Sequence, residues 1–178
     1  GSWYVYHRGL DDPAKEYLNL DLNGAVNGNA VIWGATNPSD SVFTIGSSSY
    51  VNGLNDEYVA YVFAHDDHED GYIQCGSYRG NGSSDGPEID LGWEPQWIMF
   101  KRTDDDGNWL IYDGMRGIVT GGPDERLEPN TSNAAFSSVA CEVTATGFTV
   151  TSNGSYMNQS GGTYIYMAIR RPNKPPES

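Results

Sequence analysis

Two parts of this 178-residue chain resemble each other at a nearly fixed spacing, and this constrains the fold more than any single motif. Four groups of residues recur 106 positions later, and a fifth recurs after 105. Self-similarity at a fixed period is typical of two copies of one structural unit. The matches are Trp3 with Trp109, Tyr6 with Tyr112, Ser49–Asn52 with Ser155–Asn158, Tyr58 with Tyr164, and Phe43–Ile45 with Phe148–Val150.

The repeat divides the chain unevenly. Residues 71–172 make a complete unit, whereas residues 1–64 lack a counterpart of the prelude at residues 71–108 and make a partial first unit. Residues 65–70 (HDDHED) read as a polar hinge, and residues 173–178 as a Pro-rich tail. The hypothesis that follows is that the chain begins inside a unit, as a piece of a longer protein or as a trimmed copy.

Strand patterns dominate the local sequence. The stretch Glu88–Gly117 has two bulky runs around an Asp/Gly turn, which predicts a hairpin. Further strands are expected at Tyr17–Leu22 and Ser41–Ile45, and continuous apolar runs predict central strands at Tyr58–Ala64 and Tyr164–Ile169. Abundant glycine, tyrosine and tryptophan also favour β-structure. The predicted fold is all-β, an antiparallel β-sandwich of jelly-roll or lectin-like type built from two related units.

Charge and hydropathy exclude several partners. The formal net charge of −14 disfavours nucleic acid, whose phosphates need a positive field, and an anionic membrane surface. The chain has no run of about 18 apolar residues, so no membrane span is expected. Cys75 and Cys141 lack a metal-ligand spacing, and whether they pair or stay free is left open, with burial as small hydrophobic residues the simpler interpretation.

Several motifs resemble a repeat domain of tailed-bacteriophage virion proteins, including tail and tail-fibre proteins of marine phages. The motifs are Gly80-Asn81-Gly82, Gly92-Trp93-Glu94-Pro95, Trp109–Gly117 and Tyr164–Ala168. The resemblance covers a complete unit from Gly71 to Pro172 and the later part of another from Trp3 to Ala64.

This resemblance implies a β-sandwich on the virion surface, in a tail fibre or related appendage, with a structural or adhesive role. The expected partners are other virion proteins and a host-surface glycan. A homo-oligomer such as a trimer stays open, although the chain has no coiled-coil heptads. The family has no reaction to transfer, so we expect a non-enzymatic module with no catalytic residues and no required cofactor.

Aromatic side chains beside loops are candidates for stacking on sugar rings. Most aromatics here alternate with apolar residues in expected strands, which is typical of a core. We therefore expect Trp3 and Trp109 to be equivalent core anchors. The candidates for exposed, glycan-stacking residues are Trp33, Tyr50, Tyr78 and Tyr156.

Acidic loops offer a second kind of candidate site. Asp104, Asp105 and Asp106 could supply hard oxygen ligands for Ca²⁺, but they lack EF-hand spacing, and acidic residues are also ordinary in hairpin turns. The loop at Asp66, Asp67, Glu69 and Asp70, with His65 and His68, raises the same alternatives.

The rival function is a glycan-degrading depolymerase that uses paired carboxylates. Glu88 and Asp90 stand two residues apart on an extended segment and could share one face.

Overall fold

The computed structural model describes residues 1–68, 70–118 and 121–171. Glu69, the end of the second unit at Pro172 and the Pro-rich tail lie outside the described residues. The strands are β1 (Tyr4–Val5), β2 (Glu16–Asn19), β3 (Asn27–Gly28), β4 (Ile73–Arg79), β5 (Glu88–Asp90), β6 (Pro95–Arg102), β7 (Leu110–Asp113), β8 (Asp124–Leu127), β9 (Phe136–Ser138), β10 (Cys141–Thr144), β11 (Gly147–Val150) and β12 (Thr163–Arg170). Three one-turn helices complete the fold: α1 (Ala30–Trp33), α2 (Ser49–Asn52) and α3 (Ser155–Asn158).

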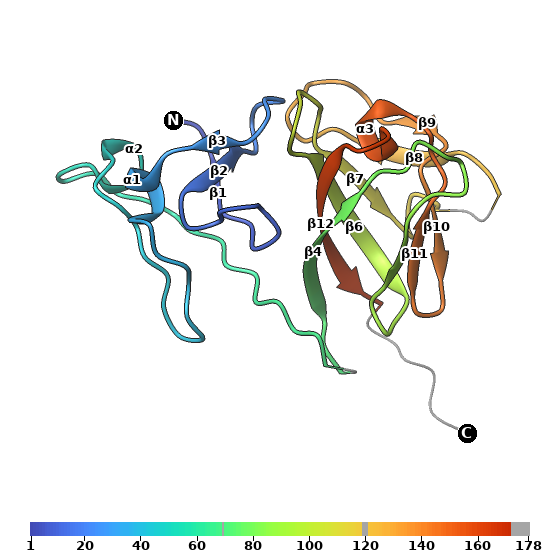
Figure 1. Cartoon of the computed structure of the whole chain (residues 1–178), viewed down its shortest axis with the longest axis horizontal. Coiled ribbons are helices and arrows are strands. Elements are labelled where there is room, and N and C mark those ends of the chain that lie inside the picture. Colours follow the sequence, from blue (N-terminus) through green and yellow to red (C-terminus); the bar gives the residue numbers. More distant parts are fainter. Residues whose placement is uncertain (69, 119–120, 172–178) are drawn as a thin grey trace.

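The strands form antiparallel sheets, as the sequence predicted. A six-stranded sheet has the order β4-β12-β6-β7-β8-β9, a three-stranded sheet the order β10-β11-β5, and the N-terminal sheet the order β1-β2-β3 (Figure 1). The architecture is all-β and consistent with a sandwich. None of the helices in the described part of the chain is long and apolar enough to cross a membrane.

The main core lies between the six-stranded sheet and the sheet β10-β11-β5. Side chains from alternate positions meet there, with Ile98 and Phe100 of β6 packed in the same cluster as Phe148 and Val150 of β11. The rings of Phe100 and Phe148 meet edge to face, with centroids 5.4 Å apart. Burial of these apolar faces supplies the main driving force for folding of residues 71–171.

A second, smaller core lies on the other face of the six-stranded sheet. Ile165 of β12 and Trp109 pack there against Leu10 and Leu18 from the N-terminal part of the chain. The Trp109 indole also donates a hydrogen bond to the carbonyl of Asn19, at 2.9 Å. Strand β12 is therefore buried on both faces, which explains its continuous apolar sequence and confirms it as a central strand.

The hairpin predicted within Glu88–Gly117 is present as β6 and β7. Trp97 pairs with Asp113 and Phe100 with Leu110, around the turn that contains the three aspartates. Trp109 is buried, but its expected equivalent Trp3 is about half exposed and contacts Tyr61, so the prediction of Trp3 as a core anchor was wrong.

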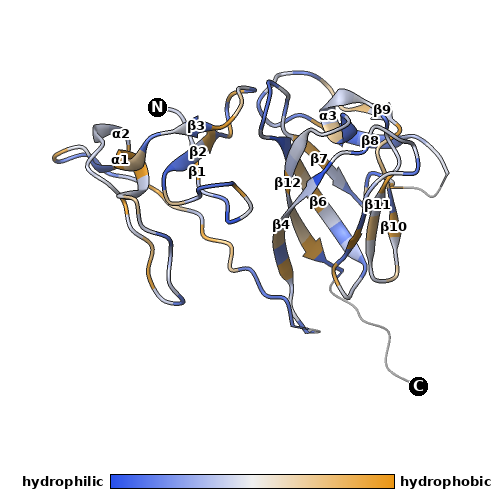
Figure 2. Cartoon of the chain, in the orientation of Figure 1, coloured by the Kyte–Doolittle hydropathy of each residue, from blue (hydrophilic) through white to orange (hydrophobic). Residues whose placement is uncertain are grey.

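Two predicted strands are absent from the described residues. Ser41–Ile45 and Tyr58–Ala64 have no strand assignment, and their large side chains are exposed. Figure 2 shows the second segment as an apolar stretch of extended chain between α2 and β4. A β-strand exists only with a hydrogen-bonded neighbour, and no such neighbour lies beside either segment within the described residues. The prediction of a buried central strand at Tyr58–Ala64 was therefore wrong for this structure.

Candidate functional site

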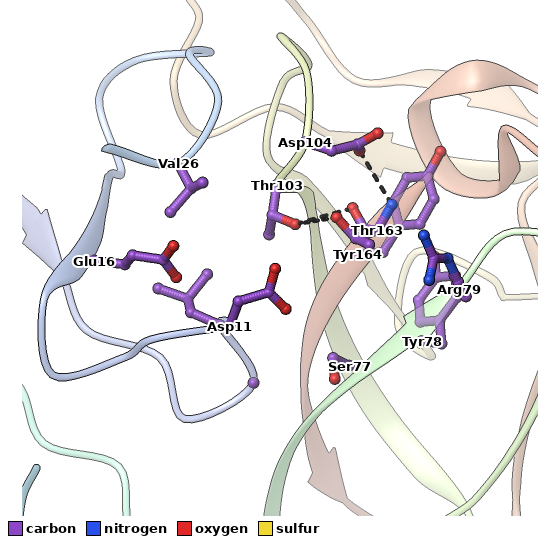
Figure 3. A pocket seen from close by; sticks show the side chains of 12 residues that line it. Asp11, Glu16, Val26, Ser77, Tyr78, Arg79, Thr103, Asp104, Thr163 and Tyr164 are labelled. Carbon is purple, nitrogen blue, oxygen red and sulfur yellow. Dashed lines mark hydrogen bonds between the residues drawn. The ribbon is translucent and has the colours of Figure 1, made fainter. Parts of the chain in front are cut away.

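The candidate site is a cavity of about 390 Å³ between the N-terminal sheet and the six-stranded sheet. Figure 3 shows polar side chains that face one another across it. Its size is within the range of small-molecule sites. The lining comprises Gly9, Leu10, Asp11, Glu16, Val26, Ser77, Tyr78, Arg79, Thr103, Asp104, Thr163 and Tyr164.

One wall of the cavity is a short turn that leads into β2. The backbone N–H groups of Lys15 and Glu16 both donate to the carbonyl of Asp12, at 2.9 Å. The Glu16 carboxylate in turn accepts from the Asp12 N–H, also at 2.9 Å. These bonds fix the turn around Pro13, so that Glu16 and the exposed Asp11 lie at the cavity (Figure 3).

The opposite wall comes from the ends of β4, β6 and β12. The Thr103 and Thr163 hydroxyl oxygens lie 2.7 Å apart and share a hydrogen bond. Asp104 accepts from the Thr163 N–H at 3.1 Å and from two guanidinium nitrogens of Arg102, at 2.9 and 3.2 Å. The hydrogen bond from Arg102 lowers the pKa of Asp104, so this carboxylate stays ionised beside the cavity.

A buried lysine joins the two walls behind the cavity. The Lys101 side chain is fully buried, and its ammonium donates to the carbonyls of Asn23, at 3.3 Å, and Arg102, at 2.5 Å. Burial lowers the pKa of Lys101 to about 8, because the charged form loses hydration. Neighbouring backbone bonds, from the Val26 N–H to the Thr103 carbonyl and from the Gly107 N–H to the Asn23 carbonyl, complete this contact.

The four aromatic candidates lie in different environments and do not form one platform. Trp33 is buried, with its indole N–H donating to the Glu16 carbonyl at 2.8 Å, so its expected exposure is not found. Tyr78 is half-buried, and its ring stacks on Tyr164 with centroids 5.1 Å apart. Tyr78 is nevertheless the only one of the four in the cavity lining.

The other two aromatic candidates are exposed. Tyr50 stacks on Tyr4, with centroids 5.8 Å apart and planes 21° from parallel. Tyr156 has the Arg126 guanidinium 5.7 Å from its ring centroid, so one face of that ring already has a cationic neighbour.

The acidic turn at Asp104–Asp106 already has protein partners. Asp105 interacts with Arg102 at 3.4 Å, and Asp106 accepts from the Ala25 N–H at 3.3 Å. These contacts occupy oxygens that the calcium hypothesis requires. Among the described residues, the acidic groups that do converge are Asp66, Asp67 and His68, whose ligand atoms lie within 4.8 Å of one another on the surface.

The remaining candidate residues lie away from the cavity. Glu88 and Asp90 both point outward from β5, on either side of the buried Ile89, and Asp90 accepts from the Gly92 N–H at 2.9 Å. The cysteines are free thiols. Burial raises the pKa of Cys75 to about 11 and raises that of Cys141 further, so neither is a ready nucleophile.

Sequence reasoning missed most of the cavity. Asp11 and Glu16 lie on one turn near the N-terminus, whereas Arg79 lies more than 60 residues later and meets them only when the N-terminal sheet docks on the six-stranded sheet. It also missed Asn158, which is fully buried and binds the glycine-rich loop after β4. The Asn158 side-chain oxygen accepts from the Asn81 N–H at 2.7 Å, and its NH₂ group donates to the Ser83 carbonyl at 2.7 Å.

Comparison with known proteins yields one match. A family model described as a domain of unknown function (DUF7483) matches residues 1–172. The searches of curated proteins and of solved structures gave no match. Because the family model spans nearly the whole sequence, the chain belongs to the DUF7483 family.

Proposed function

We propose that this chain is a non-enzymatic module of a tailed-phage virion, in a tail fibre or related appendage, that binds a host-surface glycan in the cavity between its N-terminal and six-stranded sheets. The phage assignment rests on the sequence motifs described above. The binding assignment rests on one observation, which is the polar lining of the cavity by hydroxyl, carboxylate and guanidinium groups next to a stacked tyrosine pair.

Each of these groups suits a sugar ligand. A carboxylate such as Asp11 accepts hydrogen bonds from sugar hydroxyls, and the Arg79 guanidinium donates them. Leu10 and Val26 provide an apolar surface for the C–H face of a ring. These contacts are reversible and need no bond to break.

The charges of the lining favour a particular class of glycan. Asp11, Glu16 and Asp104 supply three carboxylates, whereas Arg79 is the one basic residue of the lining. The whole chain is acidic as well. These carboxylates repel an anionic ligand, so the site would take neutral or amino sugars in preference to sialylated or sulfated ones.

A glycan array combined with a reducing-end assay tests this proposal on the full chain. Retention of neutral or amino glycans without release of reducing ends would support it. Release of new reducing ends would favour the depolymerase alternative instead. If none of the glycans binds, the adhesive role is contradicted, and only the structural role in the virion remains of the proposed function.

A further inference from the structure

The N-terminal part of the chain exposes apolar side chains whose sequence equivalents are buried in the C-terminal part. Phe43 is 47% exposed and Ile45 43%, whereas their equivalents Phe148 and Val150 are both 0% exposed. Tyr58 is 48% exposed and its equivalent Tyr164 is 0% exposed. Val59, Tyr61, Val62 and Phe63, which follow Tyr58, are exposed as well, and monomeric proteins rarely leave so many large apolar side chains of one segment uncovered.

Hydrogen bonds support the equivalence of these positions. The Tyr164 hydroxyl donates to the Ser155 carbonyl at 2.7 Å and accepts from the Gln159 N–H at 2.8 Å. The Tyr58 hydroxyl donates to the Ser49 carbonyl and accepts from the Gly53 N–H, both at 2.8 Å. The tyrosine, the residue that accepts its bond and the residue that donates to it each lie 106 positions later in the second set than in the first. Tyr58 therefore binds α2 in the same way as Tyr164 binds α3.

Strand pairing agrees with this correspondence. In the N-terminal sheet, Val5 pairs with Leu18 and Glu16 with Gly28. In the six-stranded sheet, Ile111 pairs with Leu127 and Glu125 with Ser137. The order β1-β2-β3 therefore reproduces β7-β8-β9 at offsets of 106 for the first strand and 109 for the other two.

The C-terminal part shows what covers the equivalent surface. After α3 the chain enters β12, which pairs with β4 on one side and β6 on the other. The loop that follows β4 is held by Asn158, through the bonds to Asn81 and Ser83. Tyr78 of β4 stacks on Tyr164, and Phe100 of β6 packs edge to face on Phe148, so the two strands that flank β12 cover these side chains.

The N-terminal part has counterparts of β12 and Asn158, but the described residues contain no counterparts of β4, β6 and the loop after β4 packed against them. Residues 57–64 correspond to β12 but make no backbone hydrogen bond to a strand within the described part of the chain. Asn52, the equivalent of Asn158, is exposed, and within the described part of the chain its side chain donates to the Gly46 carbonyl, at 3.1 Å, and holds no loop.

We propose that residues 43–64 form an acceptor surface that binds a β4–loop–β6 segment, of the chemistry of residues 73–102, from another unit of the same family. Residues 57–64 would become the central strand between the two incoming strands, as in β-strand addition. Asn52 would hold the incoming Gly-Asn-Gly loop. A second copy of this chain is not the expected occupant, because its own β4 and β6 are already paired with β12.

The test adds the missing segment in register to the full chain. A second copy of residues 71–106 is fused directly before Gly1, since Gly107 follows residue 106 in the complete unit. Hydrogen–deuterium exchange is measured for the amides of residues 59–63. The fusion is expected to slow their exchange at least about 100-fold relative to the parent chain. A fusion that carries the same 36 residues in shuffled order is the control.

A second variant tests the asparagine separately. The substitution Asn52→Ala should lower the melting temperature of the fusion by several degrees and that of the parent chain hardly at all. As a measurement independent of the fusion's folding, a synthetic peptide of residues 93–103 should slow the same amides of the parent chain more than a shuffled peptide does.

Two results would overturn the proposal. One is unchanged exchange at residues 59–63 with both the fusion and the peptide. The other is a parent chain that already protects these amides in a concentration-dependent oligomer, which would assign the surface to a second copy. Neither result depends on glycan binding, so the cavity and the acceptor surface are tested independently.

Discussion

Tyr58 and Tyr164 make the same two hydrogen bonds, yet one ring is half exposed and the other fully buried. This pair allows the effect of burial to be compared between two sites with the same two bonds, which differ further in long contacts of Tyr58 with Asp56, at 3.5 Å, and of Arg102 with the Ser155 carbonyl, at 3.4 Å. Tyr164→Phe removes two part-buried bonds from beneath a fully buried ring: it leaves the Gln159 N–H without its partner and the Ser155 carbonyl with only the Arg102 guanidinium, at 3.4 Å. It should lower the free energy of unfolding by about 2 kcal/mol. Tyr58→Phe should cost less than about 1 kcal/mol, because water reaches the groups that it frees. Urea unfolding of both variants measures the difference, and equal losses would contradict this account.

Asn158 supports a second paired comparison. Its side chain is fully buried and bonds to Asn81, with two reciprocal amide contacts at 2.7 and 3.0 Å, and to the Ser83 carbonyl. Asn158→Ala would remove all of these part-buried bonds at once and leave a cavity in place of a fully buried side chain, so we expect it to lower the free energy of unfolding by about 3 kcal/mol. Asn52→Ala in the same chain removes a single part-buried bond, to the Gly46 carbonyl, and should change this free energy by less than about 1 kcal/mol. Chemical denaturation followed by tryptophan fluorescence measures both, and a stable Asn158→Ala protein would show that the loop needs no such anchor.

The class of fold could be predicted from sequence because strand periodicity and turn residues are local signals. The β6–β7 hairpin and the central strand β12 both follow from such patterns. The apolar run at residues 58–64 carries the same signal as β12 but remains unpaired, since pairing depends on neighbours that periodicity does not report. The sequence pattern therefore predicts that a segment can form a strand, whereas the structure shows that β12 is hydrogen-bonded to neighbouring strands and residues 58–64 are not, within the described residues.

The candidate site was much less predictable. Tyr78 was identified from its position beside a loop, but Arg79 meets the turn that holds Asp11 and Glu16 only through the docking of two sheets. Trp33 was a candidate for stacking on a sugar because it is an aromatic residue beside a loop, yet its indole N–H donates a hydrogen bond to the Glu16 carbonyl. Residues that come together from distant parts of the chain show no periodic pattern in a single sequence, so sequence analysis could not identify them as one site.

Cavity binding predicts a specific ranking among variants. Arg79→Ala removes a guanidinium from the lining, and Asp11→Asn removes a charge while it keeps the shape of the side chain. Each should weaken binding of a glycan retained on the array at least about tenfold, or about 1.4 kcal/mol. Isothermal titration with that glycan gives the dissociation constants.

Tyr50→Ala is the matched control for those variants, since Tyr50 is exposed and lies outside the cavity lining. Its binding should equal that of the parent chain. Loss of binding in Tyr50→Ala with normal binding in Arg79→Ala would move the site to the stacked Tyr4–Tyr50 pair and contradict the cavity proposal.

Burial of His7 makes the free energy of unfolding depend on pH between about 4 and 6.5. The ring is buried, and its Nδ1 accepts from the Gly9 N–H at 3.0 Å, so Nε2 carries the proton and donates to the Tyr166 carbonyl at 3.0 Å. Burial lowers the pKa of His7 from 6.5 to about 4. The unfolded state therefore binds more protons than the folded state between these values, and the stability contributed by neutral His7 is present above pH 6.5 and is lost as the pH falls toward 4.

This loss should approach about 3 kcal/mol at the acid end of the range, by the relation of about 1.4 kcal/mol per pKa unit. His7→Gln is the matched variant, because a glutamine amide can accept from Gly9 and donate to Tyr166 but does not titrate. Urea unfolding at pH 7.0, 6.0 and 5.0 should show the parent chain losing stability relative to His7→Gln at each step. Parallel pH profiles for the two proteins would mean that His7 is protonated equally in both states, and that its burial does not couple protons to folding.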